Sequence, residues 1–177
     1  LSCLSVANLR KLPVSEDTPG LKTLEIYALG PARVVRDGQP ITNAQWEATT
    51  TKELFFLLLS QPRGLSKEQI IEALWDEISP SKGNSRFHST VHRLRRALYR
   101  DCIVREGNVY RLALEDVHYT YDVAEFDRYV AEGRLNRQRV EECFRGAMEL
   151  YQGDYLTDIY SMWAEPERAR LQREYIH

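Results

Sequence analysis

The chain has 177 residues, of which 43% are hydrophobic and 28% are charged, and its formal net charge is −2. This length and composition suit a folded protein with one complete domain and part of a second. The longest apolar run, Leu54 to Leu59, is far shorter than the roughly 20 apolar residues of a membrane-spanning helix. We therefore expect no membrane partner.

Cysteine usage points to a reducing compartment. Cys3, Cys102 and Cys143 are widely spaced and form no CxxC pair, which favours free thiols over a disulfide framework. No charged-then-apolar segment typical of secretion opens the chain. We expect a cytoplasmic protein, with intermolecular oxidation through Cys3 as an alternative fate in purified material.

Residues 1–21 are expected to be a linker or the remnant of a preceding segment. Apolar residues between Leu1 and Leu12 could form a short amphipathic stretch, but Pro13, Pro19 and Gly20 end it. Because the first residue is Leu rather than Met, we expect a fragment of a longer protein.

Short strands are expected next. Residues 24–36 read as strands, and Asp37 followed by Gly38 is typical of a hairpin turn before residues 40–41. This region is therefore expected to form antiparallel strands.

Two helices should follow these strands. Residues 50–53 (TTKE) have the form of a capping box that opens a buried helix through Leu58. Residues 66–69 (SKEQ) form a second such start, which leads into a helix ending near Trp75.

Positive charge is concentrated between residues 82 and 111, although the chain as a whole is slightly acidic. Only Asp101 and Glu106 oppose the cations there, which are Lys82, Arg86, Arg93, Arg95, Arg96, Arg100, Arg105 and Arg111. Apolar residues recur at helical spacing and predict one buried stripe: Phe87, Val91, Leu94 and Leu98. For an isolated basic helix, such charges more commonly form an ordinary solvent-exposed face with no binding role. A helix with one apolar edge and an outer face of Arg, His and Ser also suits the DNA major groove.

The residues after this helix favour the second explanation. Residues 103–105 and 109–112 alternate in polarity around Glu106, Gly107 and Asn108, which predicts a β-hairpin. Three helices followed by a hairpin, with the third helix basic, is the order of a winged helix-turn-helix. The hairpin would then be the wing, and cations on a wing can meet phosphates or the minor groove.

The remainder of the chain is predicted to be helical. Residues 122–127 (DVAEFD) have the form of a capping box with Phe126 on the inner face. A second helix is expected from about Arg137, with one apolar side formed by Val140, Phe144, Ala147, Met148 and Tyr151. A third, beginning near Trp163, is still periodic at Leu171 and Tyr175. A helical stack buries its last apolar face with further repeats, so we expect the natural protein to continue.

Residues 22–114 resemble the OmpR-type winged-helix DNA-binding domain. The motifs that carry the resemblance are residues 24–34 (LEIYALGPARV), 65–70 (LSKEQI), 91–98 (VHRLRRAL) and 110–112 (YRL). Val109 departs from the pattern, because a Gly commonly precedes the Tyr there. The resemblance implies an α+β fold with N-terminal antiparallel strands and a C-terminal β-hairpin wing.

Residues 115–177 resemble the start of a bacterial transcriptional activator domain, as found in regulators of the Streptomyces antibiotic regulatory protein type. The motifs are residues 151–156 (YQGDYL), Asp158 and residues 163–168 (WAEPER). The resemblance implies an α-helical, tetratricopeptide-like segment after the winged helix. Taken singly, each of these aromatic and leucine positions is explained equally well by ordinary helix packing.

We expect sequence-specific binding to promoter DNA followed by recruitment of RNA polymerase, the work of a transcriptional activator. The candidates for base contacts on the outward face of the basic helix are His88, Ser89, His92 and Arg93. The candidates for phosphate contacts are Arg86, Thr90, Arg95, Arg96, Arg105 and Arg111. Lys52 is a weaker candidate for a backbone contact.

The resemblance also implies partners and stoichiometry. It suggests that the loop between the second and third helices, which holds Asp76 and Glu77, faces the sigma factor of RNA polymerase. An ordinary loop with Trp75 packed in the core is the alternative. It further implies a homodimer bound head to tail on direct repeats of double-stranded DNA, in a nucleoid-associated bacterial protein.

An acidic stretch lies just beyond the wing. Its members are Glu115, Asp116, Asp122, Glu125 and Asp127. These residues could keep the junction off DNA, or they could dock against the basic domain of a neighbouring copy.

Other classes of function have less support. His88 and His92 share one helix face, but no Cys or acid accompanies them at ligand spacing, so we expect no metal. Gly83 and Gly107 stand alone rather than in a phosphate-binding loop, and no catalytic constellation is evident, so we expect neither a cofactor nor an enzyme. A protein-interaction module is the remaining rival, although the density of Arg disfavours it.

Overall fold

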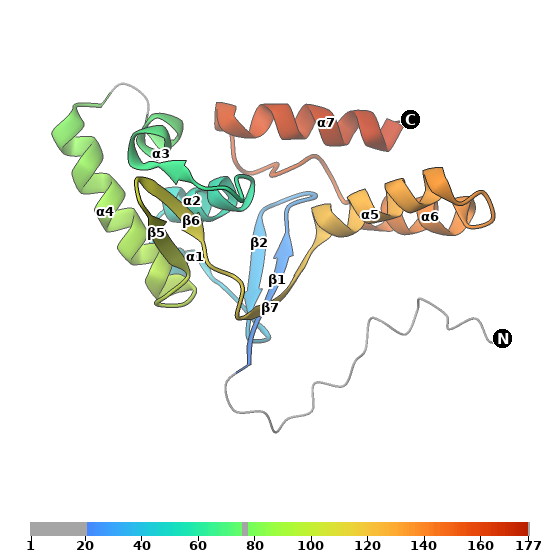
Figure 1. Ribbon diagram of the computed structural model, residues 1–177, viewed down its shortest axis with the longest axis horizontal. Helices are drawn as coiled ribbons and strands as arrows, with labels where there is room; N and C mark the ends of the chain where they lie inside the picture. The colour runs from blue at the N-terminus through green and yellow to red at the C-terminus, as the bar shows by residue number, and fades with distance from the viewer. Residues whose placement is uncertain (1–20, 76–77, 177) are drawn as a thin grey trace.

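Residues 21–75 and 78–176 are described by a computed structural model, with strands at the centre and helices at both ends (Figure 1). A four-stranded sheet has the order β3-β2-β1-β7. Its members are β1 (Lys22–Tyr27), β2 (Arg33–Arg36), β3 (Gln39–Pro40) and β7 (Val117–Tyr121). The predicted antiparallel strands are confirmed by β1, β2 and β3. The expectations for residues 1–20 and for Asp76 and Glu77 lie outside the described residues.

The predicted turn between β2 and β3 is also present. Asp37 and Gly38 have φ values of 50° and 77°, the left-handed conformation that a two-residue Asp-Gly hairpin turn requires. The Asp37 carboxylate accepts hydrogen bonds from the Thr23 backbone N–H and the Tyr99 hydroxyl, each at 2.9 Å. The turn is thereby fixed to the rest of the fold.

The three predicted helices follow in order as α2 (Thr49–Leu59), α3 (Lys67–Leu74) and α4 (Pro80–Ala97). A short helix that was not predicted, α1 (Asn43–Trp46), precedes them. The capping box of Ser66 and Gln69 is confirmed at the start of α3. The capping box predicted at residues 50–53 is wrong, because α2 begins at Thr49 with Ala48 as an N-cap that makes no side-chain hydrogen bond. Packing explains α2 instead, since residues 54–58 are all buried.

The predicted hairpin is formed by β5 (Ile103–Glu106) and β6 (Val109–Leu112), which pair antiparallel. A short strand, β4 (Leu65–Ser66), adds to β6 and completes a three-stranded sheet. Gly64 precedes β4 with a φ of 80°, and a Cβ there would lie 2.6 Å from the Tyr110 carbonyl oxygen. Only glycine fits this close approach between the α2–β4 loop and the hairpin.

The C-terminal part is helical, as predicted. It consists of α5 (Asp122–Leu135), α6 (Val140–Leu150), the short 3-10 helix η2 (Met162–Ala164) and α7 (Glu165–Ile176). Figure 1 shows α5 and α6 side by side, with α7 running above them. The capping box predicted for α5 is wrong, because Tyr121 is its N-cap and makes no side-chain hydrogen bond.

The carboxylate of Asp122 binds the loop after β1 instead of acting as a helix cap. Its side chain is 7% exposed and accepts hydrogen bonds from the backbone N–H groups of Ala28, Leu29 and Val123 at 2.8–2.9 Å. Burial raises the pKa of this carboxyl, and the three backbone donors oppose the rise. The start of α5 is thereby attached to the end of β1.

A second set of bonds joins the same loop to the segment between α6 and α7. Leu29 and Tyr155 form an isolated β-bridge, and the Leu156 N–H donates to the Ala28 carbonyl at 2.8 Å. Arg168 of α7 holds this segment in place, because its guanidinium donates to three of the segment's backbone carbonyls. We call the contacts among residues 28–32, Asp122 and residues 154–161 the junction.

Lys52 belongs to the junction too. Its ammonium group lies 2.7 Å from the Asp158 carboxylate, and Asp158 also accepts from the Ala32 N–H at 2.7 Å. The DNA-backbone role considered for Lys52 is therefore replaced, in this structure, by an ion pair within the chain.

The junction and the sheet give the described residues one continuous core. Leu24 of β1, Phe55 of α2, Phe126 of α5 and Leu171 of α7 belong to a single buried hydrophobic cluster. The boundary expected after residue 114 falls between β6 and β7, and β7 carries the following residues into the N-terminal sheet. None of the described helices is long and apolar enough to cross a lipid bilayer.

Candidate nucleic-acid interface

The local sequence of α4 explains why this helix is long and basic. Pro80 occupies its first turn, where a missing backbone N–H leaves no hydrogen bond unmade. Arg95 and Arg96 lie in its last turn, where cations interact favourably with the helix dipole. No acidic residue occurs between Pro80 and Ala97. The helix therefore presents uninterrupted positive charge on any face that is exposed.

One side of α4 is packed against the core. Its buried residues recur every three or four positions: Gly83, Phe87, Thr90, Val91, Leu94 and Ala97. Phe87 contacts the ring of Tyr110 on β6 edge to face, with a centroid distance of 4.9 Å. This contact fixes the hairpin against the helix.

Thr90 corrects the sequence prediction. We expected this residue to contact a phosphate, but it is 2% exposed and belongs to the buried stripe. The spacing from Phe87 to Thr90 to Leu94 is three and four residues, which places all of them on the core side. Thr90 therefore has almost no exposed surface of its own, although it lines the polar hollow described below.

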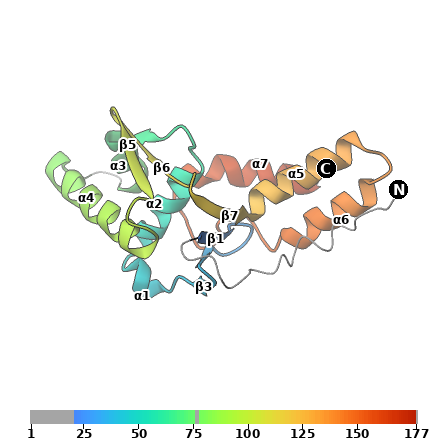
Figure 2. The same ribbon diagram turned by 60° about the horizontal axis from the view of Figure 1, so that its bottom comes forward.

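The opposite side of α4 carries the other predicted residues. Arg86, His88, Ser89 and His92 are exposed, and the Arg93 side chain is 39% exposed. Figure 2 shows α4 and the β5–β6 hairpin together at one end of the molecule, far from α5 and α6. The structure thus brings the predicted base-contact residues together on one accessible helix face.

A polar hollow of about 490 Å³ lies between the start of α2 and this face. Its lining residues are Thr50, Trp75, Ser85, Arg86, Ser89, Thr90 and Arg93. Trp75 is half-buried and packs against the core, as the ordinary-loop alternative expected for this side chain. Hydroxyl groups and guanidinium groups around one hollow suit an anionic group such as a phosphate.

Glu47 is a site residue that the sequence reading missed. It ends α1 with a φ of 62°, and its carboxylate forms ion pairs with Arg93, at 3.6 Å, and with Arg96. The two arginines were expected to face DNA without an acidic neighbour. Glu47 is 46 positions from Arg93 in the sequence, so only the fold brings them together.

Arg95 also has a structural partner. Its Nη2 donates to the Ile103 carbonyl oxygen at 3.0 Å and ties the end of α4 to β5. Its position on the helix is exposed, so the side chain lies along the surface between α4 and the hairpin.

The two wing arginines differ from each other. Arg105 is exposed, and its Nε donates to the Gly107 carbonyl oxygen at 2.9 Å. Arg111 is 26% exposed and pairs with Glu106 at 2.7 Å and with Glu115 at 2.5 Å. The pKa of Arg111 is raised by its hydrogen bonds to these two carboxylates, and the bond to Glu106 makes the largest contribution. Its charge is thus matched within the chain, whereas Arg105 keeps its charge available.

The acidic stretch beyond the wing is also partly used inside the molecule. Glu115 pairs with Arg111, Asp122 binds the backbone of the junction, and Asp127 pairs with Arg170 at 2.8 Å. In the described part of the chain, no three His, Cys, Asp or Glu side chains are placed to hold a metal ion, so His88 and His92 gain no further ligand there.

Comparison with known proteins finds similar chains among bacterial regulators. Residues 121–177 match the family model of the bacterial transcriptional activator domain. The regulatory protein AfsR of Streptomyces coelicolor is 27% identical over 165 residues, which is 90% of this chain and 16% of AfsR. The AfsR of Streptomyces griseus is 26% identical over 154 residues, which is 84% of this chain and 15% of that protein. The chain therefore spans about one sixth of the relatives it matches.

A solved structure has a similar fold. Mycobacterium tuberculosis EmbR, in complex with a low-affinity phosphopeptide, superposes with a TM-score of 0.70 at 24% sequence identity. The similarity covers 88% of this chain and 43% of EmbR. The order of strands, helices, hairpin and C-terminal helices is thus that of a known fold.

Proposed function

We propose that this chain is a DNA-binding transcriptional regulator that acts as an activator, because it resembles bacterial regulatory proteins over most of its length. The match of residues 121–177 to the bacterial transcriptional activator domain supports the class of protein. The similarity to AfsR supports a bacterial regulator. Promoter DNA is the expected ligand.

The observation that carries the proposal is the exposed face of α4. Arg86, His88, Ser89, His92 and Arg93 lie on one side of a helix that contains no acid and whose other side is buried. A helix of this kind, followed by a hairpin, has the form of a winged helix-turn-helix with α4 in the major groove. In this proposal, α2, α3 and α4 are the three helices and β5 and β6 form the wing.

The roles of single residues follow from exposure and from existing partners. His88, Ser89, His92 and Arg93 are proposed to meet base edges. Arg86, Arg105 and, once separated from Glu47, Arg96 are proposed to meet phosphates. Arg95 and Arg111 contribute less, because each already has partners within the chain.

Recruitment of RNA polymerase is the proposed second step. The loop that contains Asp76 and Glu77 is the proposed contact with a sigma factor, and α5, α6 and α7 are proposed to begin a tetratricopeptide-like stack. A single winged helix covers a modest interface, so binding as a homodimer on direct repeats would supply the specificity that one copy lacks. The proposed location is the cytoplasm, in association with the nucleoid.

The test is selection from a randomised duplex library across a salt series, with the native chain and the Arg93→Ala variant. We expect the native chain to enrich a repeated motif with a steep salt dependence. Arg93→Ala should lower affinity for that motif by about tenfold or more, because a bidentate Arg–guanine contact contributes about 1–3 kcal/mol.

Arg145→Ala is the matched control, since Arg145 is exposed on α6 at the other end of the molecule. This variant should keep both the motif and the affinity. Enrichment of no motif by the native chain would contradict the proposal and favour a protein-interaction module.

A further inference from the structure

β7 is an edge strand with an open side. β1 pairs with one edge of β7. On the other edge the Val117 N–H donates to the Leu114 carbonyl at 3.1 Å, and beyond that bond no described residue forms a backbone hydrogen bond or strand pairing there. Exposed strand edges are usually protected by Pro, by Lys or by a bulge. β7 has the sequence VHYTY, which contains neither Pro nor Lys. Its outer edge is therefore a template on which another extended chain can pair.

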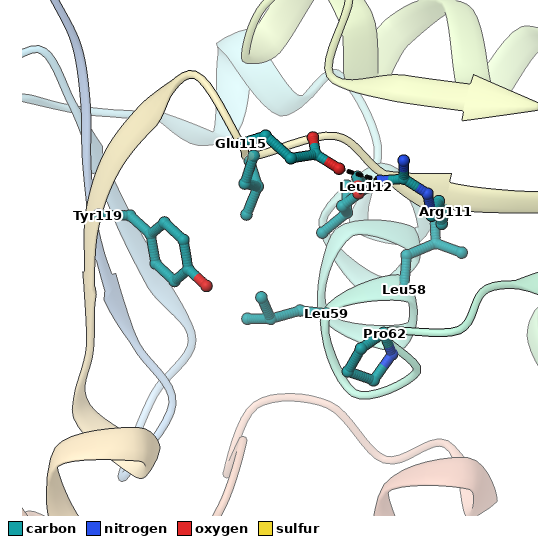
Figure 3. A pocket seen from close by; sticks show the side chains of 8 residues that line it. Leu58, Leu59, Pro62, Arg111, Leu112, Glu115 and Tyr119 are labelled. Carbon is teal, nitrogen blue, oxygen red and sulfur yellow. Dashed lines mark hydrogen bonds and ion pairs between the residues drawn. The ribbon is translucent and has the colours of Figure 1, made fainter.

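An apolar pocket of about 340 Å³ lies beside this edge. Figure 3 shows Tyr119 pointing from β7 across the pocket toward Leu59 at the end of α2. The apolar lining consists of Leu58, Leu59, Pro62, Leu112, Leu114 and Tyr119. Tyr119 is 45% exposed, although it is paired in register with the buried Leu24 and so lies on the core face of the sheet. The core face thus continues beyond β7 without a strand to cover it.

This pocket and the outer edge of β7 form a groove, which continues along the strand. Leu59 and Pro62 also line a second hollow of about 590 Å³, which reaches Tyr121 at the end of β7 and Trp163 before α7. The indole Nε1 of Trp163 is buried and has no hydrogen-bond partner among the described residues. A strand added beside β7 would place alternate side chains over both hollows and would bring backbone carbonyl groups toward this donor.

The chemistry of the edge selects a polypeptide as the occupant. Unpaired N–H and C=O groups along β7 require alternating acceptors and donors at the spacing of a strand, which an extended peptide supplies. A single extended segment supplies these groups and leaves its side chains free to enter the hollows beside the edge. Pairing of two copies through β7 is the alternative that the test below distinguishes.

The charge at one end of the groove defines the segment further. Glu106 and Glu115 share the single guanidinium of Arg111, and Asp116 is exposed and forms no ion pair with another described residue. This end of the groove is therefore acidic, and a cation on the bound segment would complement it.

We propose that the open edge of β7 binds an extended segment of a partner protein as an added strand. The segment carries apolar side chains at alternate positions, over the two hollows, and a Lys or Arg near Asp116. This surface is separate from α4, so the inference goes beyond the proposed DNA binding. A partner could thus be held while α4 remains available.

The test uses the full chain and a phage-displayed library of random heptapeptides. We expect enrichment of peptides with apolar residues at every second position and a terminal Lys or Arg. Addition of one enriched peptide, made synthetically, should slow hydrogen exchange of the β7 amides, because strand addition protects them. Protection of α7 amides alone would contradict strand addition.

A charge on the edge should weaken this binding. Tyr119→Lys is expected to weaken the selected peptide by about tenfold or more, because a lysine on an edge strand opposes pairing and fills the apolar pocket with a cation. Tyr160→Lys is the control, since Tyr160 is 87% exposed on the loop before η2 and does not line the groove. Circular dichroism of both variants checks that the fold is retained.

Several outcomes would overturn the proposal. One is a library that enriches no alternating peptide, and another is equal binding by the Tyr119→Lys and Tyr160→Lys variants. A third is a native chain that is dimeric with protected β7 amides and captures no peptide, which would show that a second copy covers the edge.

Discussion

The outward face of α4 and the junction use similar residue types in opposite ways. Arg86, Ser89 and His92 on α4 are exposed, and the structure gives them no hydrogen bond or ion pair with a described residue. In the junction, Asp122 and Arg168 each bind three backbone groups. Charged groups with internal partners stabilise the fold, whereas charged groups without them are available to a ligand. The number of internal partners therefore separates the two roles better than charge alone.

The largest expected effect comes from breaking the junction. Asp122→Ala would leave the buried N–H groups of Ala28, Leu29 and Val123 without an acceptor. We expect the free energy of unfolding to fall by about 3 kcal/mol. Urea denaturation followed by circular dichroism would measure this loss.

Asp116→Ala serves as the control for that variant, because Asp116 is exposed and should change stability little. Asp122→Asn keeps one acceptor oxygen, so its free energy of unfolding should lie between those of Asp122→Ala and Asp116→Ala. Equal stability of Asp122→Ala and Asp116→Ala would show that the buried hydrogen bonds contribute nothing net.

The next effect concerns Glu47, an acid that forms ion pairs with two arginines of α4. Glu47→Gln removes the carboxylate that pairs with Arg93 and Arg96. We expect affinity for nonspecific duplex DNA to rise by about fivefold, and the salt dependence to steepen by about one counterion, because Arg96, the proposed phosphate contact of the pair, becomes available. Fluorescence anisotropy across a salt series measures both quantities.

Glu68→Gln is the matched control, since Glu68 is exposed on α3 and lies outside the polar hollow. It should leave the salt dependence unchanged. A Glu47→Gln variant that behaves like Glu68→Gln would mean that Glu47 does not compete with phosphate.

A smaller effect is expected at the Lys52–Asp158 ion pair. Burial acts to raise the pKa of Asp158, but hydrogen bonds from Lys52 and from the Ala32 N–H bring it below its ordinary value of 3.8. Because the folded-state pKa is lowered, the stabilisation is present above pH 3.8 and is lost as the pH falls through the folded-state value. Asp158→Asn should therefore cost about 1 kcal/mol or less at neutral pH, and nothing in strong acid.

Urea denaturation at several pH values would test this expectation. The native and Asp158→Asn curves should converge only below the ordinary pKa of the carboxyl. A difference that is constant with pH would assign the effect to packing rather than to charge.

The smallest effect is expected at Arg111. Its guanidinium already binds Glu106 and Glu115, so Arg111→Ala should change DNA affinity by no more than about twofold. Arg105→Ala is the comparison, because Arg105 is exposed and has no acidic partner among the described residues. Its substitution should flatten the salt dependence by about one counterion. A larger loss for Arg111→Ala than for Arg105→Ala would reverse the assignment of the wing residues.

Local patterns in the sequence were sufficient to predict most of the helices and strands. The period of Phe87, Val91 and Leu94 predicted α4, and the alternation around Gly107 predicted the hairpin. Thr90 was assigned to a phosphate, although its spacing from Phe87 and Leu94 is that of the core stripe and its side chain is buried.

Contacts between distant residues could not be predicted in this way. β7 pairs with β1 across more than 90 residues, and nothing in either strand specifies that partner. The same limit applies to Glu47 beside Arg93 and to Asp158 beside Lys52, since Glu47 was not singled out and Asp158 was noted only as part of a family motif. Such partners are set by the packing of the elements, which a single sequence does not reveal.

The pairing of β1 with β7 also has a consequence for how the chain folds. Lys22 lies opposite Val117, so the central sheet closes only after the intervening helices and hairpin have brought the two strands together. Closing so long a loop costs conformational entropy before any contact compensates for it, and such long-range pairing slows folding. During synthesis, β1 must therefore wait beside β2 and β3 until residues 117–121 emerge, and a chain cut at residue 114 would leave one edge of β1 unpaired.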